Sequence, residues 1–234
     1  MPSRSAASSF DWQHFLYLLP LPQWQGSLRP GLAMRAGTIE LGDDPLYRQL
    51  LADVTFHNLL LAFDADLAAT ARAGRCRVCG GVLHSAKFPR KPRGRLCKLG
   101  PEHDMRFSFC CAVDCCRKRE TPPSLRFLGP KVYLAVVVVL VAIMRHGATV
   151  SRVAALTAEI GVDRRTIERW RVWWRDRFTV TPFWQAARAA LMPSVDADRL
   201  PASLLERFTG TDVDRIVELL RFIAPITGGR ARAS

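Results

Sequence analysis

The chain has 234 residues, of which 49% are hydrophobic and 24% charged, the proportions of a globular protein rather than a disordered one. Its formal net charge of +13 at pH 7 indicates a polyanionic partner such as a nucleic acid. The longest apolar run, Val132 to Met144, is shorter than the about 20 residues that a membrane span needs. The first residues lack the order of a signal peptide, so we expect a cytoplasmic protein with no membrane contact.

Two segments precede the cysteines. Residues 1–33 are rich in proline, serine, glycine and tryptophan and show no sustained period, which predicts a loose N-terminal arm. Residues 34–74 are predicted to hold an N-terminal helix. Its start is marked by Asp43-Asp44-Pro45, and apolar residues at helical spacing continue it from Tyr47 for about 25 residues, to an end near Gly74.

Residues 75–120 contain all seven cysteines and are predicted to form a zinc-ribbon-like module with a small β component. The module opens with Cys76-x2-Cys79 and two glycines. This is the pattern of a metal knuckle, because a glycine of positive φ lets backbone N–H groups turn toward the thiolates. A second pair, Cys111 and Cys116, would complete the four sulfurs that suit tetrahedral Zn²⁺.

The choice within the second pair stays open, because Cys110 and Cys115 have the same spacing as Cys111 and Cys116. We favour the latter two since Cys111 shares one face of a period-2 strand with Phe107 and Phe109. The other candidate ligands are Cys110, Cys115, His84 and His103. Free thiols in a small core are the alternative to a metal site, whereas an odd number of cysteines and no signal peptide disfavour disulfides.

The positive charge is concentrated in the same module, where residues 75–119 carry 12 basic and 3 acidic side chains. A loop rich in proline and glycine, here called the basic insert (Pro89–Arg95), can hold its cations extended toward phosphates. The alternative is a solubilising surface. The predicted phosphate contacts are Arg90, Lys91, Arg93 and Arg95 in the basic insert and Arg117, Lys118 and Arg119 at the exit of the module.

Residues 121–192 are predicted to form a helical domain that contains a helix-turn-helix. A helix over about Pro130 to His146 is apolar almost all round and should be central, although its valines also allow a strand. A short helix to Ile160, a tight turn and a longer helix, Arg164 to Phe178, follow. The longer helix buries a stripe of Ile167, Trp170, Trp174 and Phe178.

The opposite side of that longer helix would read DNA. An arginine can bond a guanine bidentately, and the start of a recognition helix is where base edges are met. The predicted contacts are Arg164, Arg165, Thr166 and Arg169. Two alternatives remain. One is an ordinary amphipathic helical hairpin, and the other is a single-strand binder in which Trp170, Trp173 and Trp174 stack on bases, although Trp170 and Trp174 are first of all core residues by their spacing.

Residues 193–234 are predicted to be C-terminal helices and a tail. Thr211 and Asp214 form a capping box for the last helix. Its apolar face would either close the core or mediate self-association. The face comprises Val213, Ile216, Leu220 and Ile223. The expected fold class is therefore mainly α with a small β zinc ribbon.

The order of these parts resembles the N-terminal DNA-binding half of insertion-sequence transposases, and small bacterial zinc-ribbon proteins associated with such elements. The resemblance rests on the cysteine pairs, the basic exit with Thr121-Pro122-Pro123-Ser124, the apolar helix, and Ile160–Trp170, which is similar to transposase and resolvase helix-turn-helix domains. It covers roughly residues 76–178. Such transposases continue into an RNase H-like domain with separated acidic metal ligands, whereas the residues after Phe178 are helical by pattern. The resemblance thus implies DNA binding without strand transfer.

We therefore expect a non-enzymatic DNA-binding protein of a mobile element, acting in transposition or its regulation. Its partners would be double-stranded DNA and a transposase or a second copy of the chain. A DNA-processing enzyme is an alternative that would need a nucleophile among Ser108, Ser124 and Tyr133. An RNA-binding or protein-adaptor zinc module is the other alternative.

Overall fold

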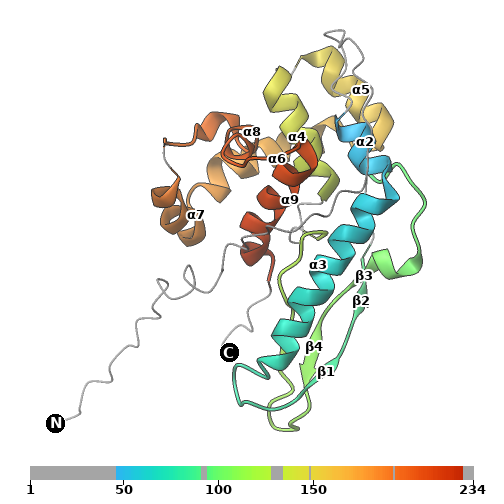
Figure 1. The fold of residues 1–234 in the computed structure, drawn as a ribbon, viewed down its shortest axis with the longest axis vertical. Helices are drawn as coiled ribbons and strands as arrows, with labels where there is room; N and C mark the ends of the chain where they lie inside the picture. Colours follow the sequence, from blue (N-terminus) through green and yellow to red (C-terminus); the bar gives the residue numbers. More distant parts are fainter. Residues whose placement is uncertain (1–45, 91–93, 128–133, 148, 192, 229–234) are drawn as a thin grey trace, which may run out of the picture. The chain divides into compact units, whose positions relative to one another are not determined.

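Helices dominate the structure, a computed structural model, and small antiparallel sheets accompany them, as the sequence predicts (Figure 1). The structure describes residues 46–228 apart from 91–93, 128–133, 148 and 192. The chain divides into two compact units, Met1–Glu40 and Leu41–Ser234, and every described residue belongs to the second. The predicted arm and the helix start at Asp43 therefore lie outside the described residues.

The elements follow one another along the chain with these bounds. The α-helices are α2 (Leu46–Ala52), α3 (Val54–Ala73), α4 (Leu134–His146), α5 (Val150–Ile160), α6 (Arg164–Val172), α7 (Pro182–Ala187), α8 (Ala202–Leu205) and α9 (Asp212–Ile223). The strands are β1 (Leu83–Ser85), β2 (Phe88–Pro89), β3 (Met105–Arg106), β4 (Phe109–Cys111) and β5 (Arg119–Glu120). The 3-10 turns are η1 (Pro101–Asp104), η3 (Arg188–Ala190), η4 (Ala197–Arg199) and η5 (Ala224–Thr227), and η2 (Trp173–Phe178) is π-helical.

The single helix predicted from Tyr47 to Gly74 is in fact two helices, because Asp53 interrupts it. The Asp53 carboxylate accepts the N–H of Thr55 at 2.8 Å and caps α3. The break leaves the carbonyl of Leu51 available, and this oxygen accepts the N–H of Leu96 at 3.1 Å and Nε2–H of His57 at 3.2 Å. The segment after the basic insert is thereby tied to the N-terminal helices.

The cysteine module (residues 75–120) forms a three-stranded antiparallel sheet in the order β1-β4-β5 and a separate pair of β2 with β3. In the first sheet Leu83 lies opposite Cys111. Alternate residues of β4, Phe109 and Cys111, are buried with Leu83 against Ala68 of α3, which confirms the predicted buried face. This is the smaller of two hydrophobic cores.

The larger core is built around α4, as its apolar sequence predicts. Every side chain from Val137 to Ile143 is buried, and α4 packs against α2, α6 and α8. The valine run is helical and not a strand. Helix α3 belongs to both cores, since Phe56 and Leu60 lie in the larger one and Ala68 in the smaller one.

Two capped helices follow α4. Thr149 caps α5, Gly161 ends it at φ 63°, and Asp163 caps α6. The predicted apolar stripe is confirmed, as Ile167, Trp170, Trp174 and Phe178 are all buried. From Trp173 the α-helix gives way to the π-helical η2.

Helix α9 closes the larger core. Its capping box between Thr211 and Asp214 is present as predicted, and Ile216, Leu220 and Ile223 are buried. Because the packing of this chain already covers that face, it offers no support for self-association there, which stays a prediction.

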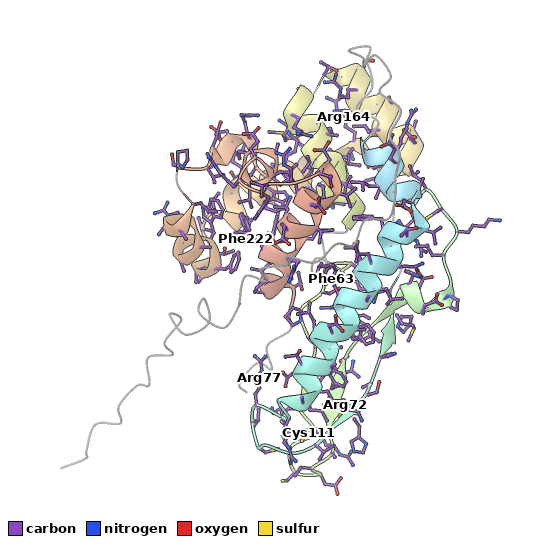
Figure 2. The ribbon with its side chains drawn as sticks, viewed as in Figure 1. Phe63, Arg72, Arg77, Cys111, Arg164 and Phe222 are labelled. Carbon is purple, nitrogen blue, oxygen red and sulfur yellow. The ribbon has the colours of Figure 1, made fainter. Side chains whose placement is uncertain are left out.

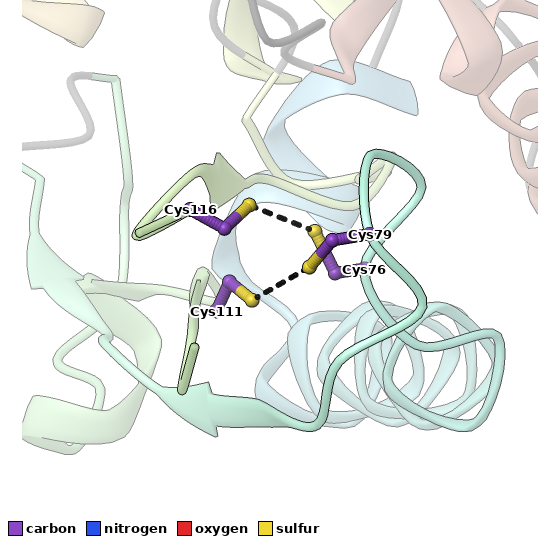
Figure 3. A group of neighbouring side chains, drawn as sticks. All are labelled: Cys76, Cys79, Cys111 and Cys116. Atoms are coloured by element: carbon purple, nitrogen blue, oxygen red, sulfur yellow. Dashed lines mark hydrogen bonds between the residues drawn. The ribbon is translucent and has the colours of Figure 1, made fainter. Parts of the chain in front are cut away.

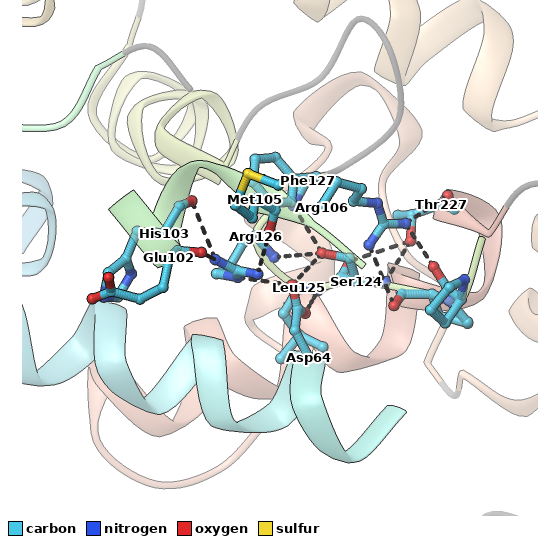
Figure 4. A network of polar contacts seen from close by, with 12 residues as sticks. Asp64, Glu102, His103, Met105, Arg106, Ser124, Leu125, Arg126, Phe127 and Thr227 are labelled. Atoms are coloured by element: carbon cyan, nitrogen blue, oxygen red, sulfur yellow. Dashed lines mark hydrogen bonds and ion pairs between the residues drawn. The ribbon is translucent and has the colours of Figure 1, made fainter. Parts of the chain in front are cut away.

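A buried polar network, which the sequence analysis missed, joins the cysteine module, α3 and the segment that leads to α4 (Figure 4). Asp64 of α3 is 1% exposed and accepts from Ser124 Oγ at 2.5 Å and from the N–H of Leu125 at 2.6 Å. Arg126 Nε donates to the same carboxylate at 2.8 Å. The remaining Arg126 nitrogens donate to the carbonyls of Glu102, His103 and Met105.

Arg106 and Thr227 extend the network to the C-terminal end. Arg106 Nη2 donates to the carbonyls of Pro122, at 2.6 Å, and Thr227, at 3.2 Å. Burial lowers the pKa of Arg106 to about 10, against the raising effect of Asp64, so its guanidinium is charged at neutral pH. The hydroxyl of Thr227 accepts the N–H of Ser124 at 2.8 Å.

The network yields a stability prediction. Replacement of Asp64 with asparagine should destabilise the protein by about 3–5 kcal/mol, because it leaves the buried Arg126 without its charge partner. Asp66→Asn, an exposed aspartate on the same helix, is the matched control and should change the stability by less than about 0.5 kcal/mol. Urea unfolding followed by circular dichroism measures both. Equal stability of the two variants would contradict the assigned role of Asp64.

Candidate functional site

The first half of the site is a tight turn over residues 76–81, here called the first knuckle. The N–H of Gly80 donates to the carbonyl of Cys76 at 2.7 Å, and the N–H of Cys76 donates to the carbonyl of Gly81 at 2.9 Å. Gly80 has φ 69°, the left-handed conformation that the sequence pattern predicted. The turn directs Cys76 and Cys79 toward the same point.

The second half is a similar turn over residues 111–118, the second knuckle, which connects β4 to β5. The N–H groups of Cys116 and Arg117 both donate to the carbonyl of Val113. Here Arg117 itself adopts φ 43°, where the first knuckle uses a glycine. The N–H of Cys111 donates to the carbonyl of Lys118 at 3.0 Å, which closes the turn.

The two knuckles bring four sulfurs together (Figure 3). The Sγ atoms of Cys79 and Cys111 lie 3.4 Å apart, those of Cys76 and Cys116 lie 3.7 Å apart, and all four are within 4.8 Å of one another. A tetrahedral ion with sulfur ligands at about 2.3 Å places its sulfurs about 3.8 Å apart. The geometry therefore fits a metal ion with four thiolate ligands.

The backbone around the sulfurs favours thiolates. The N–H groups of Val78 and Cys79 lower the pKa of the Cys76 thiol to about 7. For Cys79 the Gly81 N–H is the largest single influence and lowers the pKa, but the Cys111 sulfur, burial and the Cys76 sulfur together outweigh it, and the net shift is upward. One thiolate thus forms readily, and a cation is needed to stabilise the others, as expected where metal binding releases protons.

The other candidate ligands point elsewhere. The Cys110 thiol faces the carbonyl of Arg117 at 3.5 Å, and Cys115 is exposed outside the cluster. His103 is buried with its Nε2 at 3.1 Å from the side-chain oxygen of Asn58. His84 is exposed on β1. Among the described residues, the four predicted cysteines are the group that could hold a metal ion.

Gly81 is a determinant of the site that the sequence pattern only hinted at. A Cβ at this position would come within 2.6 Å of Val113 Cγ2, 3.1 Å of Cys111 Sγ and 3.3 Å of Cys79 Sγ. Only glycine lets the two knuckles approach this closely. The dipeptide Gly80-Gly81 after Cys79 is the signal, one glycine for the turn and one for the approach.

The cations of the basic insert have mixed surroundings. Arg90 is exposed, with its guanidinium 5.0 Å from the centre of the Phe88 ring. Arg95 is half-buried and pairs with Asp104 at 2.9 Å, so it anchors the insert. Lys91 and Arg93 lie outside the described residues.

The three predicted phosphate contacts at the exit of the module also differ in their surroundings. Arg117 is paired with Asp114 in the second knuckle, and Arg119 lies with its guanidinium 5.8 Å from the Phe88 ring centre. Lys118 is half-buried.

The start of α6 carries the predicted DNA contacts on its solvent side. Arg164, Arg165 and Arg169 are exposed, and Thr166 is half-buried. Arg169 Nη2 donates to the Thr166 hydroxyl at 2.7 Å, which orients the guanidinium along the first turn. Trp173 is half-buried and packs edge-on against Trp174, so its ring is part of the aromatic core.

The serines considered for the enzymatic alternative have structural surroundings. Ser108 is buried and donates to the carbonyl of Glu120, while Ser124 donates to Asp64. A histidine that could serve as a base contacts neither of them in the described part of the chain. Tyr133 lies outside that part.

Comparison with protein-family models, curated protein sequences and solved structures finds no match to this chain. Among the described residues, each helix is too short or too polar to cross a membrane.

The knuckle geometry predicts that Gly81→Ala weakens metal binding about tenfold or more, because the added methyl group pushes Val113 and two sulfurs apart. Gly74→Ala is the matched control, since its Cβ would meet atoms no closer than 3.6 Å. Competition with a chromogenic chelator measures both affinities. The same affinity in the two variants would show that the close approach at Gly81 is not required.

Proposed function

We propose that the chain is a DNA-binding protein of a mobile genetic element that combines a zinc ribbon with a helix-turn-helix. The observation that carries the proposal is α6. One side of this helix is buried by Ile167 and Trp170, and its opposite side presents exposed arginines at its first turns. A capped, basic helix start after a tight turn is the arrangement in which recognition helices meet base edges.

Zinc is the metal that the four-thiolate cluster best fits. Thiolate-only tetrahedral sites select zinc or iron–sulfur chemistry, and a single ion within four sulfurs held by two turns is the arrangement of structural zinc sites. Cys76 and Cys111 are buried and belong to the smaller core. Zinc in this position stabilises the sheet, and no catalytic role is assigned to it.

The supporting electrostatics are those of a duplex binder. Arg164 and Arg165 lie next to the N-terminal end of α6, where backbone N–H groups also favour a phosphate. Arg90 in the basic insert supplies a further exposed cation for the DNA backbone. The resemblance to transposase DNA-binding regions suggests binding to the ends of a mobile element, as an accessory or regulatory factor.

Zinc binding is tested by elemental analysis of purified protein, with one Zn²⁺ per chain expected. Structural zinc binding supplies on the order of 10–16 kcal/mol in small fingers, so a chelator should unfold the cysteine module. Cys111→Ser should lose the metal, and Cys115→Ser, which removes an exposed thiol, should retain it. Purified protein without stoichiometric metal would refute the zinc assignment.

DNA recognition is tested by selection from a random duplex pool. The wild-type protein should select a defined sequence, and Arg165→Ala or Arg169→Ala should lose about 1–3 kcal/mol of discrimination at one base pair. Arg188→Ala, which removes an exposed arginine from η3, should leave the selected sequence unchanged. Selection of no sequence by the wild-type protein, or tighter binding to structured RNA than to the duplex, would refute the proposal.

A further inference from the structure

Three exposed valines lie on or beside the two knuckles that carry the four-cysteine cluster. Val78 is 61% exposed, Val82 is 51% and Val113 is 37%, whereas the residues that form the smaller core beneath them are buried. Val78 lies within the first knuckle, Val82 follows it, and Val113 lies in the second knuckle with its Cγ2 close to Gly81. The N–H of Ala112 donates to the carbonyl of Val82, which holds the two knuckles side by side.

These valines contribute little to the fold. None of the three belongs to either hydrophobic core of the described residues, and the knuckle turns are closed by backbone hydrogen bonds and sulfurs. Single exposed apolar residues are ordinary, but these three lie on two adjoining turns that a backbone hydrogen bond holds side by side, and exposed apolar surface of this kind is a mark of protein–protein contact. We call Val78, Val82 and Val113 the valine surface.

Positive charge surrounds the valine surface. Residues 72–82 and 112–120 contain six basic and two acidic side chains. Both acids already have partners, since Glu120 pairs with Arg77 at 2.9 Å and Asp114 with Arg117. Four basic side chains of these two ranges are then left without an acidic partner in the described part of the chain, and Arg72 (Figure 2) and Arg75 are exposed members of that group.

We propose that the valine surface is a docking site for an acidic amphipathic segment of a partner protein. Such a segment would place apolar side chains on the valines and carboxylates beside the surrounding cations. A DNA backbone fits less well, because phosphates would have to lie against exposed valines and gain nothing from covering them. The inference is independent of DNA binding by α6.

The rigid backbone of the two knuckles makes them a suitable place for the valine surface. The four-cysteine cluster and the hydrogen bonds of the two turns fix the backbone that carries the valines, so little conformational freedom is lost when a partner binds. Apolar contact supplies affinity, and the surrounding charges supply the association rate and the choice of an acidic partner.

The test uses the full-length, zinc-loaded protein and a phage library of random 16-residue peptides. Selected peptides are synthesised, and their affinity is measured by fluorescence anisotropy for the wild-type protein and for variants. We expect enriched peptides that combine aspartate or glutamate with large apolar residues. Val78→Ser combined with Val82→Ser should weaken them at least tenfold, Arg75→Gln should weaken them less, and Val180→Ser, an exposed valine after η2, should have no effect.

Four results would overturn the inference. One is the absence of an enriched sequence, and another is enrichment of peptides without acidic residues. The third is a decrease in duplex DNA affinity for the Val78→Ser, Val82→Ser protein but not for Val180→Ser, which would assign the surface to nucleic acid. Zinc content and thermal unfolding of each variant establish that it is folded, so unaltered peptide binding by a folded valine variant also rejects the proposal.

Discussion

The buried ion pair between Asp64 and Arg126 is the interaction on which the arrangement of the chain depends. The two residues are far apart in the sequence, and between them lie the four-cysteine cluster and both small sheets. Asp64 holds the start of the segment that leads to α4, and Arg126 donates to the backbone around η1 and β3. Both hydrophobic cores are thus joined at one carboxylate, through a helix, α3, that already belongs to each of them.

Burial of these charges is tolerated because nearly every polar atom in the network is paired. Taking a carboxylate and a guanidinium out of water costs several kcal/mol each, and the pair offsets this only when the remaining donors and acceptors are also satisfied. Asp64 accepts three hydrogen bonds, and Arg126 donates to three carbonyls besides the carboxylate. Such a pair adds little net stability but penalises any other packing of the two cores, which would leave a buried charge without its partner.

Local chemistry could be predicted from the sequence, whereas distant contacts could not. The grouping of Cys76, Cys79, Cys111 and Cys116, the Thr211–Asp214 capping box and the stripe through Trp170 follow from spacing over a few residues, and the structure has them as expected. Asp53 falls inside the helix predicted from Tyr47 to Gly74, because a cap inside an apolar period gives no signal beyond residue type. In the same pattern Asp64 is one polar position of that long helix, and Ser124 and Arg126 belong to no periodic stretch. Their burial depends on a partner about 60 residues away, which no periodicity encodes.

The position of the four-cysteine cluster in the chain connects it to the packing of helices outside the cysteine module. Cys76 lies three residues after Ala73, the last residue of α3, and belongs to the core that also holds Ala68. A metal ion bound by the four sulfurs would therefore order the C-terminal half of α3, the half that carries Asp64. The second knuckle leads through β5 into the segment that Asp64 and Thr227 hold. The four-cysteine cluster thus adjoins both α3 and the segment that Asp64 holds, and α4 in turn packs against α5 and α6. A metal ion bound by the four sulfurs would for this reason be coupled to the order of the basic helix α6 through packing and not through direct contact.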